Sequence, residues 1–88
     1  MVKIILPAGW TEGRRTVFES ADGPLSDVIK AFAAAYPAYR HRVLGPDDEP
    51  LTYVNFCVDD DIVPRHLRAT TVVEAGATIT VMPPMAGG

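Results

Sequence analysis

The sequence of 88 residues has a single cysteine, Cys57, and no long hydrophobic run. One cysteine cannot form a disulfide within the chain, which is typical of proteins that work in a reducing compartment. The first apolar stretch ends at Pro7, so it is too short for a transmembrane helix or for the hydrophobic part of a secretory signal. We therefore expect a cytoplasmic protein with no membrane partner.

Positive charge is also scarce. The chain has 8 lysines and arginines against 11 aspartates and glutamates, which gives a formal net charge of −3. A protein that binds nucleic acid or an anionic membrane needs a basic face, and the longest basic run here is the pair Arg14-Arg15. We expect no nucleic-acid partner. The sequence leaves open whether four other arginines contact a protein partner: Arg40, Arg42, Arg65 and Arg68.

Motifs for catalysis and for metal binding are missing. No glycine-rich phosphate loop is present, and the only histidines, His41 and His66, lack the spacing of a zinc site. The acidic stretches 47–49 and 59–61 lack the glycine and the bidentate glutamate of a calcium loop. We predict a protein that is not an enzyme and that holds no metal and no cofactor of its own. The acidic stretches are expected to be solvated turns, with docking onto a basic partner as the alternative.

The sequence does contain the pattern of a small α+β domain. Strands are predicted where β-branched and apolar residues alternate, at residues 2–6, 15–20, 52–58 and 78–82, with a short edge strand at 62–64. Pro24 suits the first turn of a helix, Pro37 ends it, and a turn of 3₁₀ helix is expected at 68–71. Between the two prolines, apolar residues recur at the spacing of one helix face: Leu25, Val28, Ile29, Phe32 and Tyr36.

This order of elements predicts a mixed sheet of four to five strands with one main helix packed across one face. Phe18 and Tyr53 are expected on the open face, where an apolar patch would suit a partner. Trp10 is either a cap on the core or an exposed docking residue. Cys57 has two interpretations, a small strand filler or a sulfur-bearing group, and the filler is favoured because no basic residue is adjacent to activate its thiol.

The last six residues are Pro83, Pro84, Met85, Ala86, Gly87 and Gly88. Two prolines stop the last strand and favour an extended, flexible tail over residues 83–88, apart from a folded domain at 1–82. Two glycines without a Cβ let the end of the chain enter a narrow channel. The carboxylate of Gly88 is an anion at neutral pH and can attack the α-phosphate of an ATP that another protein positions.

These features resemble the ThiS/MoaD family of ubiquitin-like sulfur carriers, with CysO-type and MoaD-type carriers nearest in appearance. The resemblance rests on residues 2–6, 25–36, 53–59 and 74–81 and on the tail. It implies a β-grasp fold at 1–82. In place of the usual glycine-containing turn, the chain has Asp60-Asp61.

The resemblance also implies a function. An E1-like (ThiF/MoeB-type) adenylyltransferase would consume ATP to adenylate Gly88, and a sulfur donor such as a sulfurtransferase would convert it to a thiocarboxylate. A downstream synthase would accept the sulfur, in the cysteine or specialised-metabolite branch first and in molybdopterin synthesis next. The residues that enter the partner would be Gly87, Ala86, Met85, Pro84 and Pro83. The alternative is a ubiquitin-like modifier that is conjugated to lysines through Gly88.

Overall fold

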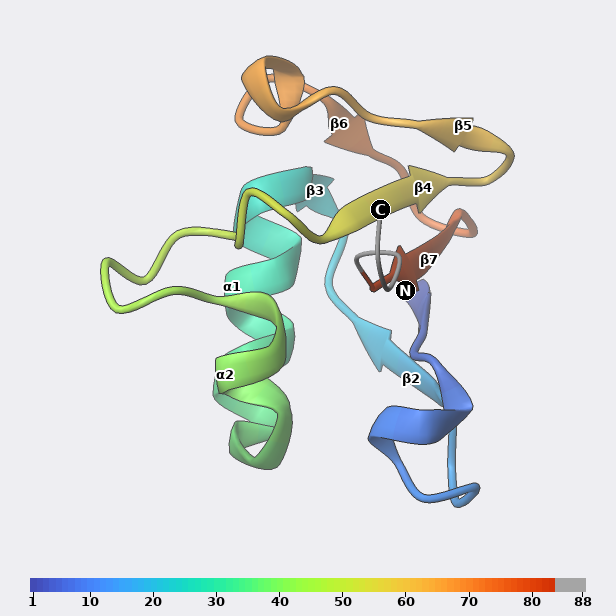
Figure 1. Cartoon of the computed structure of the whole chain (residues 1–88). Helices are drawn as coiled ribbons and strands as arrows, with labels where there is room; N and C mark the ends of the chain where they lie inside the picture. The colour runs from blue at the N-terminus through green and yellow to red at the C-terminus, as the bar shows by residue number, and fades with distance from the viewer. Residues whose placement is uncertain (84–88) are drawn as a thin grey trace.

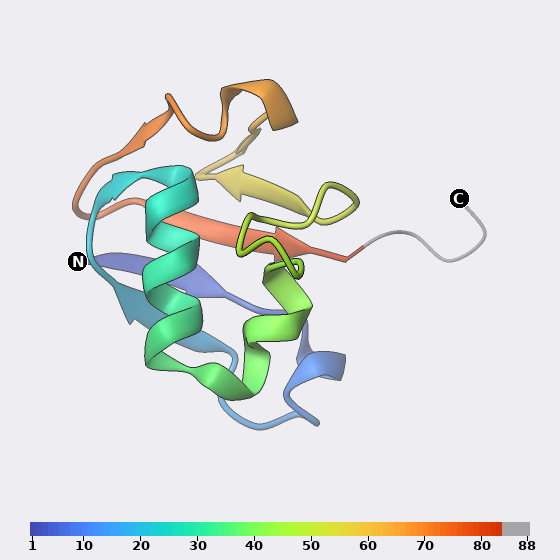
Figure 2. The same ribbon diagram turned by 90° about the vertical axis from the view of Figure 1, so that its left-hand side faces the viewer.

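A computed structural model of the chain describes residues 1–83. It has a five-stranded mixed sheet with one long helix across one face (Figures 1 and 2). The two central strands, β1 (Val2–Ile5) and β7 (Thr78–Met82), are parallel, and β2, β4 and β5 add to them antiparallel in the order β2-β1-β7-β4-β5. The outer strands are Val17–Ser20 (β2), Asn55–Val58 (β4) and Asp61–Ile62 (β5). The predicted α+β architecture is confirmed.

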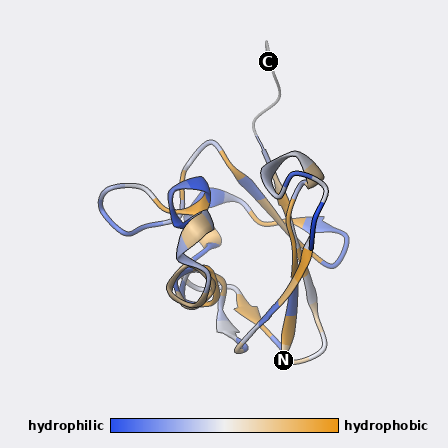
Figure 3. Cartoon of the chain, turned by 90° about the horizontal axis from the view of Figure 1, so that it is seen from below, coloured by the Kyte–Doolittle hydropathy of each residue, from blue (hydrophilic) through white to orange (hydrophobic). Residues whose placement is uncertain are grey.

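The helix α1 (Leu25–Ala35) buries the apolar face that its sequence predicts. The structure buries Leu25, Val28, Ile29 and Phe32 completely or almost so, against the inward-facing residues of the sheet. Figure 3 shows α1 end-on beside the sheet, with hydrophobic residues on the elements that enclose the core. Burial of one such side chain contributes about 1.5–3 kcal/mol, so this face accounts for much of what holds the helix in place.

The start of α1 differs from the prediction. Pro24 belongs to a two-residue strand, β3 (Gly23–Pro24), which pairs antiparallel with β6 (Val72–Val73). The first N–H groups of the helix are satisfied by neighbouring backbone, since Leu25 N–H donates to Thr71 O and Ser26 N–H donates to Arg68 O. Strands of two residues leave no alternating pattern, so the sequence does not reveal this ribbon.

The prediction that Phe18 lies on the open face of the sheet is wrong. Phe18 is 3% exposed and pairs across the ladder with Ile4, which is also buried. Its ring centroid lies 4.8 Å from that of Tyr36. Residues directly opposite one another in an antiparallel pair share a face, so the register with Ile4 turns Phe18 inward and leaves Val17 44% exposed. Because Val17 and Phe18 are both apolar, the sequence alone does not decide which of them faces the core.

Three 3₁₀ helices and one short α-helix complete the described chain. The 3₁₀ helix η1 (Ala8–Trp10) follows β1, and η2 (Pro37–Tyr39) leads into the short α-helix α2 (Arg40–Val43). The third, η3 (Arg65–Leu67), begins three residues before the predicted 3₁₀ turn at 68–71. Ladder pairing in β4 begins at Asn55, and residues 52–54 form a turn instead of the predicted strand. No helix within the described residues has the length and hydrophobicity needed to cross a bilayer.

Candidate functional site

Of the predicted site residues, only Pro83 falls within the described part of the chain. Pro84, Met85, Ala86, Gly87 and Gly88 lie outside the described residues, as does most of the predicted tail at 83–88. The structure therefore defines the base of the tail, where β7 ends and Pro83 follows. The features around this point are the candidate site.

The strand that leads to Pro83 is held on both edges. In the sheet register, Thr80 pairs with Ile5 of β1, and Val81 pairs with Phe56 of β4. The side chain of Val81 is buried in the core. Pairing continues to Met82, and Pro83 has no N–H with which to extend the ladder. The point at which the chain leaves the sheet is thus fixed by backbone bonds and by the core.

A groove of about 410 Å³ lies beside Pro83 on one side. Three separate segments form it: η1, α2 and residues 51–54, which precede β4. We call it the tail-exit groove and define it by its lining residues: Trp10, His41, Arg42, Leu51, Tyr53, Val54 and Pro83.

Trp10 and Arg42 are in contact at the rim of the tail-exit groove. The guanidinium carbon of Arg42 lies 5.5 Å from the centroid of the Trp10 ring, within the range of a cation–π interaction. Trp10 is partly buried against the core, as the core-cap interpretation predicts, and it also lines the groove; its role in docking stays a prediction. His41 is exposed at the same rim. Among residues 1–83, no three histidine, cysteine, aspartate or glutamate side chains are grouped as a metal site would require.

A second, apolar hollow of about 450 Å³ lies on the other side of Pro83, between β1 and β7. Its lining includes Ile5, Pro7 and Met82. On the same open face of the sheet, the thiol of Cys57 lies 3.3 Å from the sulfur of Met82. This packing against a neighbouring strand fits the strand-filler interpretation of Cys57. Tyr53 is 59% exposed, but it lies in the turn at residues 52–54 and lines the tail-exit groove, so the patch predicted for Tyr53 and Phe18 on the open face is not formed.

The buried side chain of Arg68 binds the backbone of residues 51–54, which form one wall of the tail-exit groove. This side chain is only 5% exposed, and it donates hydrogen bonds to Leu51 O (2.9 Å) and Val54 O (2.5 Å). Its guanidinium also lies 4.8 Å from the Phe56 ring centroid. Burial, and secondarily the charge of Arg65, lower the pKa of Arg68 below its usual value. Arginine remains protonated at neutral pH in spite of such a shift. The sequence gives no signal for this role, because Arg68 stands in an exposed, basic stretch.

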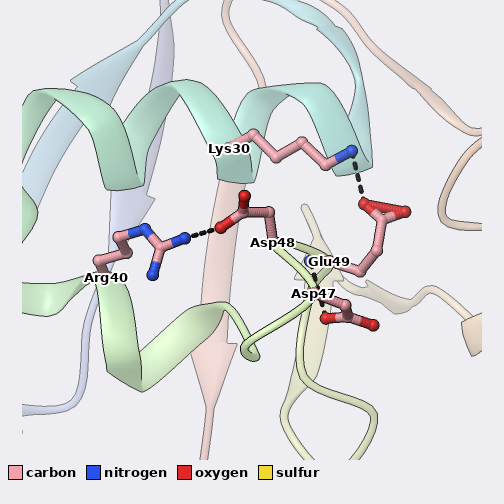
Figure 4. Close-up of polar contacts among 5 residues, drawn as sticks. All are labelled: Lys30, Arg40, Asp47, Asp48 and Glu49. Atoms are coloured by element: carbon pink, nitrogen blue, oxygen red, sulfur yellow. Dashed lines mark hydrogen bonds and ion pairs between the residues drawn. The ribbon is translucent and has the colours of Figure 1, made fainter.

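The three carboxylates of the acidic loop at residues 47–49 bind other groups of the same chain (Figure 4). Lys30 Nζ lies 2.5 Å from Glu49 Oε2, and Arg40 forms an ion pair with Asp48. The hydrogen bond with Glu49 raises the pKa of Lys30. Asp47 Oδ1 accepts a hydrogen bond from the backbone N–H of Glu49. These contacts shape the loop, and they neutralise two of its three carboxylates.

Comparison with known proteins places this geometry in a family. The model of the ThiS family matches residues 8–88. The chain belongs to the ThiS family. A comparison with curated proteins found no match.

Solved structures of ubiquitin-like proteins have the same fold as this ThiS-family chain. A chain of the Amycolatopsis orientalis BexX/CysO complex is 23% identical, with 100% of each chain covered and a TM-score of 0.77. Mycobacterium tuberculosis CysO is 22% identical over 97% of this chain and 100% of that chain, with a TM-score of 0.76. SAMP1 from Haloferax volcanii is 23% identical over 99% of this chain and 98% of that chain, with a TM-score of 0.74.

The predicted resemblance to ThiS/MoaD-type, CysO-like proteins and the predicted β-grasp fold are confirmed by the family match and by this structural likeness. In general terms, the chain is a ubiquitin-like protein of the ThiS family.

Proposed function

We propose that this chain is a sulfur carrier protein whose reacting group is the carboxylate of Gly88. A carboxylate oxygen attacks the α-phosphorus of ATP in an E1-like (ThiF/MoeB-type) enzyme, pyrophosphate leaves, and Gly88 becomes an acyl-adenylate. Sulfur at the oxidation level of hydrosulfide, supplied by a sulfurtransferase, then displaces AMP and leaves a thiocarboxylate. A downstream synthase takes the sulfur from it.

The observation that carries the proposal is the family match, which extends through Gly88. The base of the tail supports it, because β7 pairs with β1 up to Thr80 and with β4 up to Met82, and Pro83 cannot continue the sheet. A reacting group on a tail needs a firm base if a partner is to position it to within an ångström or so.

The catalytic groups and the ATP site are assigned to partner proteins, so the chain acts as a substrate and not as an enzyme. The tail-exit groove and the apolar hollow, as the described residues form them, contain no carboxylate and no nucleophile paired with a base. Gly87, Ala86, Met85, Pro84 and Pro83 are the residues proposed to enter the partner's channel. The proposal requires the cytoplasm, where ATP and reduced sulfur are both available.

The recipient of the sulfur is proposed to be an enzyme of cysteine or specialised-metabolite synthesis, with molybdopterin synthesis as the next choice. Support comes from the structural likeness to CysO in its complex with BexX and to the CysO of Mycobacterium tuberculosis.

The second candidate function is that of a protein modifier, which is favoured by the likeness to SAMP1, a small archaeal modifier protein. The same acyl-adenylate serves both functions, because only the attacking nucleophile differs. A lysine amine that displaces AMP would leave an isopeptide bond in place of a thiocarboxylate.

Intact mass spectrometry tests the proposal. The chain is incubated with ATP, a sulfide source and the E1-like enzyme of the same organism, and the expected product is heavier by the difference between one sulfur and one oxygen atom. A variant that ends at Ala86 is the control and should not change in mass. Conjugates that survive a reducing gel would favour the modifier. A variant ending at Ala86 that still supports product formation would overturn both functions.

A further inference from the structure

The register of the sheet places one group of carboxylates far from the base of the tail. Asp59 N–H donates to Thr78 O, and Gly76 N–H donates to Met1 O, so the turn between β4 and β5 and the turn before β7 lie at the start of β7. The aspartates at 59–61 and Glu74 are therefore at the opposite end of the sheet from Pro83. In a chain of net charge −3, the tail-exit groove is lined by a basic rim and by no carboxylate.

Two arginines on the same short helix α2 differ in their pairing. Arg40 forms an ion pair with Asp48, whereas Arg42 lies over Trp10 and has no carboxylate within ion-pair distance among residues 1–83. A guanidinium stacked on an aromatic ring keeps its outward N–H groups directed at solvent and can bind a carboxylate with two parallel hydrogen bonds. Arg42 is thus equipped to receive an acidic group.

The groove around Arg42 is suited to an apolar side chain as well. Trp10 and Tyr53 contribute aromatic rings, while Leu51, Val54 and Pro83 contribute aliphatic surface. Two features of the chain hold its walls in place: the backbone N–H of Trp10 donates to the carbonyl of Pro7, the residue before η1, and Arg68 donates to the carbonyls of residues 51 and 54. A groove whose walls are held in advance loses less conformational entropy when a partner binds.

We propose that the tail-exit groove docks an acidic segment of the E1-like enzyme that activates Gly88. A carboxylate of that segment pairs with Arg42, and a neighbouring apolar side chain inserts between Trp10 and Tyr53. This inference rests on the proposed function, since it names the surface by which the activating enzyme recognises its carrier. Because the groove borders Pro83, docking there brings the base of the tail to the enzyme.

Calorimetry and pyrophosphate exchange test the docking surface with two matched variants. In R42Q the stacked, unpaired guanidinium is removed, whereas in R40Q the same change is made two residues earlier, where the charge is already paired. The dissociation constant between the carrier and the enzyme, measured without ATP, should rise about tenfold in R42Q and stay within about twofold in R40Q. The binding of R42Q should also be less sensitive to salt. R42K should recover part of the affinity, since it keeps the charge without the planar fork.

The kinetic readout separates docking from chemistry. In ATP–pyrophosphate exchange, R42Q should raise the KM for the carrier and leave kcat close to that of the wild type. Equal effects of R42Q and R40Q would overturn the docking proposal, as would no effect of either. A wild-type chain that binds the enzyme but supports no exchange would instead overturn the proposed function.

Another occupant of the groove would give a different result. If the groove binds the acidic end of a second copy of this chain, the protein alone should associate as its concentration rises, and R42Q should abolish that association. Gel filtration of both proteins over a range of concentrations tests this, and such behaviour would overturn the proposal. Trp10 is the single tryptophan and lies under Arg42, so its emission should change in R42Q and stay that of the wild type in R40Q.

Discussion

Replacement of Arg68 by methionine should destabilise the domain. Arg68 donates to Leu51 O and Val54 O, and hydrogen bonds that involve a charged group contribute about 1.5–3 kcal/mol each. Leu51 O also accepts a bond from Val54 N–H, whereas Val54 O has no other partner among the described residues. The main loss is therefore the bond at Val54 O together with the cost of leaving that carbonyl unsatisfied.

Two effects oppose this loss. Methionine removes a charge whose burial is unfavourable, as the lowered pKa of Arg68 shows. It also removes Nε, a buried donor with no partner among residues 1–83. We expect the hydrogen bonds to prevail, with a net loss of about 2 kcal/mol in the free energy of unfolding. For a domain of this size, the loss corresponds to a melting temperature lower by about 10 °C.

Urea unfolding followed by the fluorescence of Trp10 measures this difference. The midpoint should fall in R68M while the slope of free energy against urea stays constant, because a similar surface is exposed on unfolding. Arg65→Met is the control: Arg65 is exposed, and its loss should change stability by less than about 0.5 kcal/mol. If R68M proves as stable as the wild type, the desolvation cost equals the hydrogen bonds and our account of the groove wall is wrong.

Three further predictions test the corrected face of β2, the role of the thiol and the acidic loop. Phe18→Ala should lose about 3–5 kcal/mol of stability in urea unfolding, because the ring is buried, whereas Tyr53→Ala at an exposed position should lose little; comparable losses would contradict the register. Cys57→Ser should leave thiocarboxylate formation unchanged by intact mass, and failure to form it would revive the sulfur-bearing interpretation. Glu49→Gln should leave the urea midpoint at neutral pH unchanged, because the pair with Lys30 is exposed. The pKa of Lys30 is raised in the folded protein, so any stabilisation by that pair is present below the unfolded pKa near 10.5 and is lost as pH rises through the folded pKa. A difference in urea midpoint between the wild type and Glu49→Gln that grows above that pH would contradict this direction.

The sequence reveals the helix and the central strands because each has one dominant periodicity. The apolar residues of α1 recur at helical spacing, and Ile79 and Val81 alternate with threonines, so burial follows from local pattern. At β2 the pattern is ambiguous, since both Val17 and Phe18 are apolar, and only pairing with β1 decides which of them faces the core. The β3–β6 ribbon is too short for any pattern and depends on contacts between distant segments.

The candidate site is harder to predict because its parts are far apart in the sequence. Trp10, Arg42 and Tyr53 come from three connecting segments, and only the packing of η1 and α2 beside β4 brings them to Pro83. Arg68 is less predictable still: a buried arginine that binds two backbone carbonyls has no local signature, and its neighbours in sequence are exposed. Local pattern thus indicates where the tail begins, but not what surrounds it.

The distance between the docking surface and the chemistry limits where the partner's reaction centre can lie. The six residues after Met82 span at most about 20 Å when fully extended, so an enzyme that acts on Gly88 must place its ATP within that distance of the end of β7. Any surface that helps to align the reaction must therefore be near Pro83, and the acidic end of the sheet, near Thr78, is at the far end of the strand. If a carrier docked through the aspartates at 59–61, much of the length of its tail would be needed to run back along its own sheet to the enzyme. The tail-exit groove avoids this, because it adjoins the fixed base of the tail and carries the charge that an acidic partner segment would recognise.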